Sequence, residues 1–319
     1  MTIAPSVVTL GECMAVLYPT RPVGLDRADR ILLDIAGTEA NTAIGLARLG
    51  EATRFISQVG DDPFGRRIRA TLHREGVDVS YLGTHPEAPT GVFFREPLSD
   101  GARRVYYYRA GSAASLITPG YLNPEAFRGA RIVHLSGITP ALSATAAATV
   151  LRAIEIARDV NARVSFDPNY RPRLWDAATA AVTLIELVRK VDILLMSEQD
   201  AGVLFGGGDT FGLARAAELG PSTVVLKQAE RGAIALSGDK LYRVSPRRVK
   251  KVVDTVGAGD GFNAGFLAGV LRGLEIDECL SLGAEIGAKA VGKLGDYAGY
   301  PKKPGKREEG RGKGKKEKS

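Results

Sequence analysis

Short apolar runs alternate with longer stretches of helical periodicity along most of the chain. The runs that we expect to form strands are residues 7–19, 53–60, 131–137, 163–169, 192–197 and 223–228. The expected helices between and beside them are residues 39–49, 63–75, 142–160 and 177–190. Strands rich in Val, Ile and Leu and separated by helices are typical of a parallel sheet that is covered on both faces. The pattern therefore predicts an α/β fold with a mostly parallel central sheet.

Residues 90–111 break this alternation. They predict two strands joined by the turn signal "SDG". Together with part of residues 12–36 they could form a small antiparallel sheet over the main domain, which we call the lid (about 12–36 and 90–110). A sheet this small leaves an apolar face exposed and its edges free, which favours closing over a ligand or pairing with another copy. We therefore expect a homo-oligomer, at least a dimer, with the lid in the interface.

The net charge says little about the ligand, because most of it lies at one end of the chain. The protein has 319 residues, 45% of them hydrophobic, and a formal charge of +7. This length suits one large α/β domain with a smaller appendage. Residues 302–319 carry nine Lys and Arg against three Glu, so the rest of the chain is nearly neutral. We expect residues 301–319 to be a disordered basic tail. A nucleic-acid-binding arm is the alternative for that tail, but we do not expect nucleic acid as a partner.

Cysteine usage and hydropathy bear on the compartment. Cys13 and Cys279 lie in apolar surroundings without metal-ligand spacing, which predicts buried thiols in a reducing compartment. No stretch approaches the 18 apolar residues of a membrane span, and no basic region precedes the first apolar run. We expect a soluble, cytoplasmic protein with no membrane contact.

A glycine-rich turn, "DTVGAGDGFNAGF" at residues 254–266, precedes an apolar helical run. Glycine permits close approach of the backbone to a ligand, and the first amides of a helix attract an anion. An acid there is poorly placed to bind an anion, so Asp260 is a candidate proton acceptor. The P-loop pattern and the GxGxxG fingerprint of dinucleotide sites are both absent from this turn.

A second glycine turn, "AGTEANTAIGLARLG" at residues 36–50, leads into a helix with Asn41 in its first turn. Together the two motifs resemble the ribokinase-like (PfkB) family of sugar kinases, and the resemblance extends from about residue 7 to about residue 300. It implies a ribokinase-like kinase domain over residues 1–300, a β lid, and the use of ATP and Mg²⁺.

Within this family, four further segments resemble the members that phosphorylate 2-keto-3-deoxygluconate on its terminal hydroxyl. These are residues 106–113, 134–143, 167–175 and 294–296. The substrate is a sugar acid, and guanidinium and phenol groups hold a carboxylate well. The resemblance assigns substrate contacts to Gly37, Asn41, Tyr107, Arg109, Arg171 and Asp296, with Tyr107 and the two arginines at the carboxylate.

The resemblance also implies the roles of the catalytic and nucleotide-binding residues. Asp260 would take the proton from the attacking hydroxyl, while the amides of Gly257, Ala258 and Gly259 would form an anion hole. Nucleotide contacts fall on Asn169, Ser197, Lys227 and Gly232. Asp200 would act on Mg²⁺ indirectly.

Two other functions remain open. A kinase for a neutral sugar, such as ribose or fructose, is the nearest alternative, although two arginines facing a neutral sugar would lack a partner. A non-catalytic sugar sensor is the other, although such a protein has no need of a base beside an anion hole. The preferred C4 epimer of the keto-acid is also open.

Several residues depart from the family pattern. Ala36 and Ala229 stand where relatives carry glycine, so an added methyl could narrow either site if positive φ is required. Phe93 replaces a frequent tyrosine and removes one possible hydrogen bond. These departures bear on substrate affinity more than on the fold.

Overall fold

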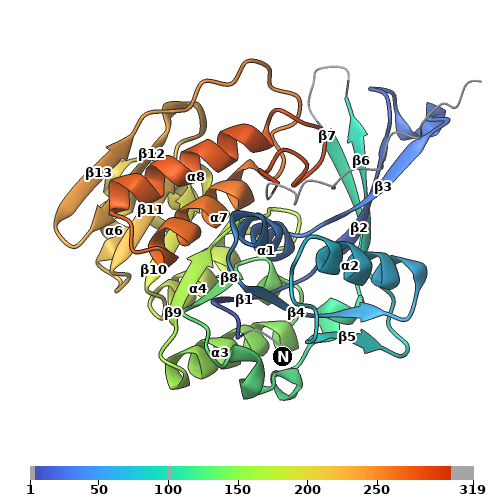
Figure 1. The fold of residues 1–319 in the computed structure, drawn as a ribbon, viewed down its shortest axis with the longest axis horizontal. Helices are drawn as coiled ribbons and strands as arrows, with labels where there is room; N and C mark the ends of the chain where they lie inside the picture. The colour runs from blue at the N-terminus through green and yellow to red at the C-terminus, as the bar shows by residue number, and fades with distance from the viewer. Residues whose placement is uncertain (1–3, 99–102, 303–319) are drawn as a thin grey trace, which may run out of the picture.

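The computed structural model describes residues 4–98 and 103–302, and within them the expected α/β class is confirmed (Figure 1). The central sheet has nine strands in the order β13-β12-β11-β10-β9-β8-β1-β4-β5. Their bounds are β1 Val7–Leu10, β4 Thr53–Gly60, β5 Leu82–His85, β8 Ile132–Ser136, β9 Arg163–Asp167, β10 Ile193–Ser197, β11 Thr223–Lys227, β12 Ala233–Ser237 and β13 Lys240–Val244. All neighbours from β5 to β11 are parallel, and β12 and β13 add antiparallel pairs at one edge.

Helices cover both faces of this sheet, as the strand pattern predicts. The α-helices are α1 Thr38–Leu49, α2 Pro63–Arg74, α3 Ala144–Asp159, α4 Ala177–Val188, α5 Glu198–Phe205, α6 Thr210–Ala217, α7 Ala258–Leu271 and α8 Ile276–Ala290. Short 3-10 turns occur at Leu25–Arg27, Ala113–Leu116, Pro119–Tyr121, Pro124–Phe127, Thr139–Ala141 and Ala229–Arg231. Helices α3 to α6 pack on one face, whereas α1, α2, α7 and α8 pack on the other (Figure 1). The carboxyl ends of the parallel strands are thus framed by α1 and α7.

The apolar run at residues 7–19 is the one expected strand that the structure divides. Its first part is β1 in the central sheet, and its second part is β2 (Met14–Pro19) in the lid. The chain changes sheets at Gly11, where an added Cβ would lie 2.1 Å from the carboxyl carbon of Glu39. Both parts are almost wholly buried, so hydrophobicity alone does not reveal the break.

The lid is a four-stranded sheet in the order β3-β2-β6-β7. Its other strands are β3 Ile31–Ala36, β6 Val92–Pro97 and β7 Arg103–Tyr108. The outer pairs, β2–β3 and β6–β7, are antiparallel. The central pair, β2 and β6, is parallel, and each of these strands is the first that the chain forms when it leaves the main domain for the lid. The proposed "SDG" turn at 99–101 lies outside the described residues, as does the tail from 303 to 319.

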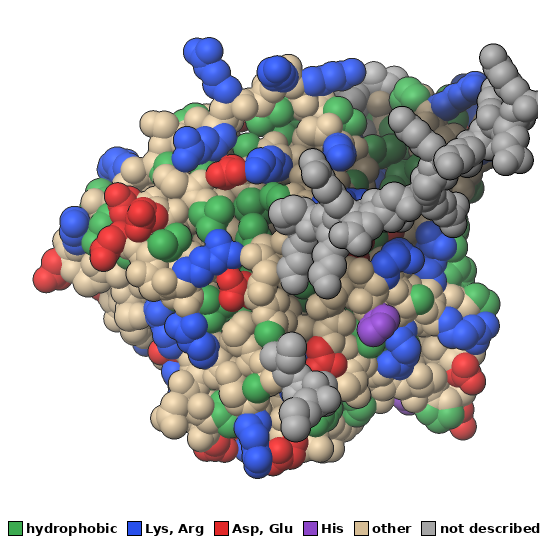
Figure 2. Space-filling view, in the orientation of Figure 1, with side chains coloured by type: hydrophobic (Ala, Val, Ile, Leu, Met, Phe, Trp, Pro, Cys, Tyr) green, Lys and Arg blue, Asp and Glu red, His purple; other side chains and the backbone are tan. Residues whose placement is uncertain are grey.

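The surface seen in Figure 2 mixes the two signs of charge. Lys and Arg side chains are interspersed with Asp and Glu over this face, in keeping with the nearly neutral body of the chain. In the described part of the chain, every helix is too short or too polar to cross a bilayer. Cys13 and Cys279 are buried free thiols, as the sequence predicts.

Candidate active site

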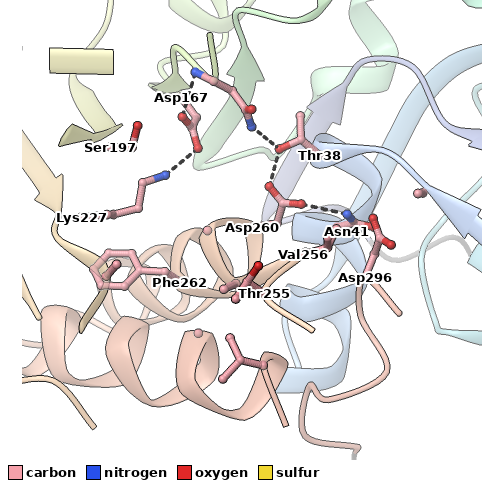
Figure 3. Close-up of a pocket in the computed structure, with 18 of the residues that line it drawn as sticks. Thr38, Asn41, Asp167, Ser197, Lys227, Thr255, Val256, Asp260, Phe262 and Asp296 are labelled. Atoms are coloured by element: carbon pink, nitrogen blue, oxygen red, sulfur yellow. Dashed lines mark hydrogen bonds and ion pairs between the residues drawn. The ribbon is translucent and has the colours of Figure 1, made fainter. Parts of the chain in front are cut away.

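A cleft of about 1100 Å³ lies where the lid faces the carboxyl edge of the central sheet (Figure 3). Its lid wall includes Met14, Phe93, Arg95, Val105 and Tyr107. The opposite wall is formed by the first turns of α1 and α7 and by loops that follow β9, β10 and β11. Every residue that the sequence singles out as a site residue lines this one cleft. The two glycine motifs, more than 200 residues apart, therefore meet in space.

Asp260 lies in the first turn of α7 and points toward the first turn of α1 (Figure 3). Its Oδ2 accepts a hydrogen bond from Asn41 Nδ2 over 2.8 Å, and its Oδ1 accepts one from the Thr38 hydroxyl. Burial raises the pKa of Asp260 to about 6, although both hydrogen bonds act to lower it. A carboxylate with this pKa can accept a proton near neutral pH.

The turn before Asp260 requires glycine. Gly257 has φ of 77° and caps α7, and an added Cβ would lie 1.8 Å from the carbonyl oxygen of Asp296. The carbonyl of Gly257 accepts a hydrogen bond from the hydroxyl of Tyr300 over 2.6 Å. Amides at the start of a helix point out of its end toward the cleft. Among the expected anion-hole donors, Ala258 N makes a long bond of 3.3 Å to Thr255 O.

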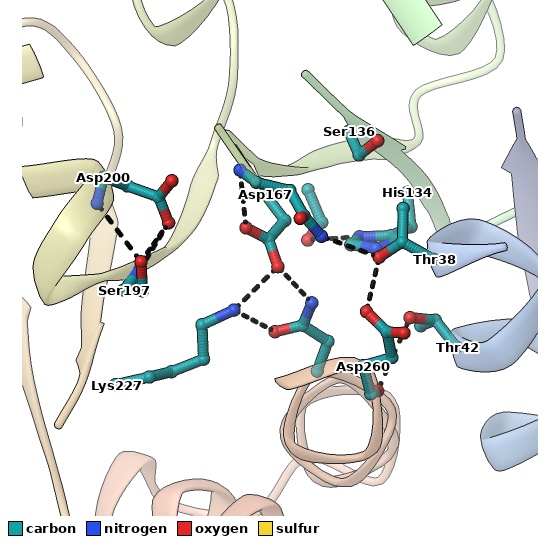
Figure 4. A network of polar contacts seen from close by, with 12 residues as sticks. Thr38, Thr42, His134, Ser136, Asp167, Ser197, Asp200, Lys227 and Asp260 are labelled. Carbon is teal, nitrogen blue, oxygen red and sulfur yellow. Dashed lines mark hydrogen bonds and ion pairs between the residues drawn. The ribbon is translucent and has the colours of Figure 1, made fainter. Parts of the chain in front are cut away.

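A second polar cluster lies beside Asp260 at the ends of β9 and β11 (Figure 4). Lys227 Nζ lies 2.7 Å from Asp167 Oδ2 and donates to Asn263 Oδ1 over 3.1 Å. Asn263 Nδ2 also donates to Asp167 Oδ2 over 2.7 Å. The charge of Lys227 is thus balanced within the protein, and its ammonium group is fixed at the edge of the sheet.

Ser197 and Asp200 form a helix cap. Asp200 Oδ2 accepts hydrogen bonds from the Ser197 amide over 2.8 Å and from its hydroxyl over 2.6 Å, while Oδ1 accepts the Tyr170 amide over 2.8 Å. Both carboxylate oxygens of Asp200 therefore hold the protein's own groups. No group of three or more His, Cys, Asp or Glu suited to a metal occurs in residues 4–98 and 103–302. The residues present fit a Mg²⁺ that is bound mainly by nucleotide phosphates and water.

The residues expected to contact the substrate carboxylate differ in their surroundings. Arg109 forms an ion pair with Glu12, whose Oε1 also accepts the Ser112 hydroxyl over 2.6 Å. The argument that Arg109 would lack a partner beside a neutral sugar is therefore wrong. Arg171 is exposed and makes no ion pair with any described residue. Tyr107 lines the cleft and packs on Phe93, with ring centroids 5.4 Å apart.

Asp296 lines the cleft but is also tied to the lid. Its Oδ1 accepts a hydrogen bond from Arg95 Nη2 over 2.6 Å. The sequence does not single out Arg95, Glu12 or Asn263, whereas Thr38 lies within residues 37–41, to which the resemblance assigns sugar contacts. Asn263 lies within the quoted glycine motif at residues 254–266, so its polar side chain is a usable signal, but nothing local marks Arg95 or Glu12.

Ala36 and Ala229, which stand where relatives carry glycine, differ in backbone conformation. Ala229 has φ of 49°, so its backbone is in the left-handed region that favours glycine. Ala36 ends β3 with a regular strand conformation and needs no positive φ. Gly232 has φ of 91°, and an added Cβ would lie 2.1 Å from the carbonyl oxygen of Val244. Gly37 lets the backbone approach Glu12, whose carbonyl oxygen would lie 2.2 Å from an added Cβ. Of the two alanines that replace a glycine, only Ala229 therefore carries backbone strain from its methyl group.

Known proteins share both sequence and structure with this chain. Residues 4–303 match the sequence family described as pfkB family carbohydrate kinase. A 2-dehydro-3-deoxygluconokinase of Bacillus subtilis is 37% identical over 297 residues, which cover 92% of each chain. A fructokinase of Salmonella typhimurium is 32% identical, over 92% of this chain and 95% of its own. The crystal structure of a 2-dehydro-3-deoxygluconokinase from Thermotoga maritima, 27% identical, superposes with a TM-score of 0.84 and covers 92% of this chain and 95% of its own.

Proposed function

Because this chain belongs to the pfkB family of carbohydrate kinases, we propose that it transfers the terminal phosphoryl group of ATP to the terminal hydroxyl of 2-keto-3-deoxygluconate. The product would be 2-keto-3-deoxy-6-phosphogluconate. The name 2-dehydro-3-deoxygluconate denotes the same sugar acid, and the similarity to the kinase of Bacillus subtilis over 92% of both chains supports this substrate. The observation that carries the proposal is the buried Asp260 at the start of α7, beside a glycine turn in a deep cleft.

Asp260 would act as the general base. The attacking hydroxyl would give its proton to a carboxylate oxygen of Asp260 as its oxygen bonds to the γ-phosphorus of ATP, and the bond from that phosphorus to the bridging oxygen would break to release ADP. Hydrogen bonds from Thr38 and Asn41 orient that carboxylate. Such proton transfer contributes roughly 10²–10⁴-fold to the rate in typical enzymes.

The glycine turn would stabilise charge on the transferred phosphoryl group. The amides of Gly257, Ala258 and Gly259 lie at the N-terminal end of α7, where backbone dipoles favour an anion. Because Gly257 is fixed by contact with Asp296 and by the hydroxyl of Tyr300, these donors are preorganised. Preorganised donors of this kind supply a large part of the rate enhancement in many enzymes.

The nucleotide would lie over the ends of β9 to β11. Asn169, Ser197, Lys227 and Gly232 line that part of the cleft. Lys227 would hold a phosphate oxygen as a point charge, which Asp167 keeps in place. Bound Mg²⁺ would neutralise charge on the phosphates. Asp200 would reach the ion only through water, because its oxygens already accept protein hydrogen bonds.

The sugar acid would bind between the lid and the first turn of α1. Gly37, Asn41 and Asp296 would contact its hydroxyl groups, and Arg171 and Tyr107 would contact its carboxylate. Arg171 is the expected carboxylate ligand whose charge has no described partner. Arg109 would contribute through the Arg109–Glu12 pair, whose net charge is zero.

A kinase for a neutral sugar is the second candidate. The Arg109–Glu12 ion pair supports it, since a compensated arginine can face a neutral sugar at little cost. The 32% identity to a fructokinase supports it as well. A coupled assay with ATP and each of 2-keto-3-deoxygluconate, its C4 epimer, fructose and ribose separates the two. We expect the highest kcat/KM for one of the keto-acids, and a higher value for a neutral sugar would refute the proposed substrate.

We also propose that the protein is a homo-oligomer that pairs through the lid. The outer face of the lid is apolar and partly exposed. It includes Leu17, Ile31, Leu33, Phe94, Tyr106 and Tyr108. Ile31 is 43% exposed and Tyr108 is 68% exposed, and the side chains of this face form an apolar patch of the kind that marks an interaction surface. A cytoplasmic location is part of the same proposal, since the buried thiols would remain reduced there.

A further inference from the structure

Two arginines of the lid contact the main domain beside the glycine turn. Arg95 on β6 donates from Nη2 to Asp296 Oδ1 over 2.6 Å, and its Nη1 lies 3.5 Å from Asp254 Oδ2. Arg103 on β7 forms an ion pair with the other oxygen of Asp254. These contacts link the lid to the segment that carries Asp260.

The two carboxylates determine the shape of the glycine turn. Asp254 begins the turn, and its oxygens accept hydrogen bonds from Val256 N over 3.0 Å and Gly295 N over 3.3 Å. The backbone of Asp296 packs directly against Gly257, leaving no room for a Cβ. A shift of either aspartate would therefore move the amides that we assign to the anion hole.

This cluster is buried and electrically balanced. Exposed fractions are 4% for Arg95, 1% for Asp254 and 6% for Asp296. Burial raises the pKa of Asp296, and the charge of Arg95 opposes that rise. Removing one partner of a buried ion pair leaves an uncompensated charge, which costs far more than the pair gains. Without Arg95, negative charge would remain beside a turn that must accept a phosphoryl anion.

We propose that Arg95 is a positioning residue for phosphoryl transfer, holding the glycine turn in its reactive shape while the lid covers the cleft. This inference rests on the proposed kinase function. Arg95 is a better candidate than Arg103, because it contacts both carboxylates and is more deeply buried. Arg95 contacts the protein's own carboxylates and acts through Asp254 and Asp296.

The test compares Arg95→Gln, Arg95→Lys and, as a control, Arg128→Gln. Arg128 pairs with Glu125 outside the lid, and its side chain is 76% exposed. We expect Arg95→Gln to lower kcat by at least about 100-fold, while the affinity for the keto-acid, measured by calorimetry without ATP, changes less than about 5-fold. Arg95→Lys should recover part of the loss, and Arg128→Gln should match the unmodified protein.

A purely structural role would give a different result. If Arg95→Gln keeps kcat within about 3-fold, or weakens sugar binding as much as it slows turnover, the inference is wrong. If Arg95→Gln does not fold, the double variant Arg95→Gln/Asp254→Asn restores the charge balance. Slower turnover of the folded double variant than of Asp254→Asn alone supports positioning by Arg95, and equal turnover of the two refutes it. Failure of the proposed function is distinct, since the unmodified protein would then phosphorylate none of the sugars.

Discussion

The side-chain amide of Asn41 donates to Oδ2 of Asp260 over 2.8 Å, joining the first turn of α1 to the first turn of α7. The Thr38 hydroxyl donates to the other oxygen, and Asn169 donates to that hydroxyl over 2.9 Å. Two donors from the first turn of α1 thus fix one buried carboxylate, and Asn169, which follows β9, holds one of these donors in place. The function of that carboxylate can be tested without altering its shape.

Asp260→Asn keeps the size of the side chain and removes its ability to accept a proton. We expect kcat to fall by at least about 100-fold, with sugar affinity changed only a few-fold. Steady-state assays together with calorimetry measure the two effects separately. Asp277→Asn is the matched control, since Asp277 occupies the first turn of the neighbouring α8 but is exposed to solvent. Unchanged turnover in Asp260→Asn would exclude this residue as the base.

The pH dependence of kcat/KM should reveal the same group. The base must be ionised, so activity should fall as the pH drops through about 6, the raised pKa of Asp260. Thr38→Val removes a donor that stabilises the ionised form, so the acid limb should move to higher pH. An acid limb near pH 4, or one that Thr38→Val leaves in place, would contradict this assignment.

Glu39 should make the protein less stable as the pH rises. Its carboxyl is fully buried in α1, and burial raises its pKa to about 7 despite hydrogen bonds from Ser136 and Thr139. The folded state therefore binds the proton more tightly than the unfolded state. Stability should be lost from about pH 4.5 to about pH 7, by about 3 kcal/mol at most.

Glu39→Gln removes this dependence because the amide does not ionise. We compare the Tm of Glu39→Gln with the Tm of the unmodified protein at each pH. The Tm of the variant minus that of the unmodified protein should be several degrees larger at pH 8 than at pH 5. Thermal unfolding followed by circular dichroism measures this difference. Glu285→Gln, on the exposed side of α8, should show no such change with pH. A difference in Tm that is independent of pH would show that Glu39 is not held protonated by burial.

The outer face of the lid provides a test of assembly. Phe94→Lys places a charge among partly exposed apolar side chains, and we expect it to shift the protein toward monomer. Light scattering at micromolar concentration gives the mass. Val182→Lys is the control, since Val182 is 71% exposed on α4, far along the chain from the lid. A monomeric mass for the unmodified protein would refute lid pairing.

The end of the kinase domain can be located by truncation. The sequence predicts that the kinase domain ends at residue 300, and Tyr300 is buried, with its carbonyl oxygen accepting a hydrogen bond from Arg48 over 3.1 Å. A chain that ends after Lys302 should keep its turnover and lose any salt-dependent binding to duplex DNA. A chain that ends after Gly299 should lose at least about 10-fold in kcat, because Gly257 loses its hydroxyl donor. Equal turnover of the two chains would show that Tyr300 is dispensable.

The central groups of the cleft can be predicted from the sequence because they lie in short, local motifs. Gly257 and Asp260 are three residues apart, and their roles follow from the start of one helix. The ion pairs around them cannot be predicted from the sequence, because Arg95 and Asp296 are 201 residues apart and nothing near either residue indicates the other. The sequence does not reveal the pair of Arg109 with Glu12 for the same reason. The expectation that Arg109 would lack a partner beside a neutral sugar is therefore wrong. The hydrophobic pattern does not reveal the break between β1 and β2 at Gly11, because both strands are buried.

The chain crosses between the main domain and the lid four times, since the lid strands come from two separate stretches, Met14–Ala36 and Val92–Tyr108. The parallel pair β2–β6 joins these two stretches, so neither stretch forms the complete sheet alone. No single cut in the gene excises the lid, and no single insertion could have added it in this form. Recombination between family members at one site between the two stretches would therefore combine two lid strands from each parent, and these would have to match along the β2–β6 pair.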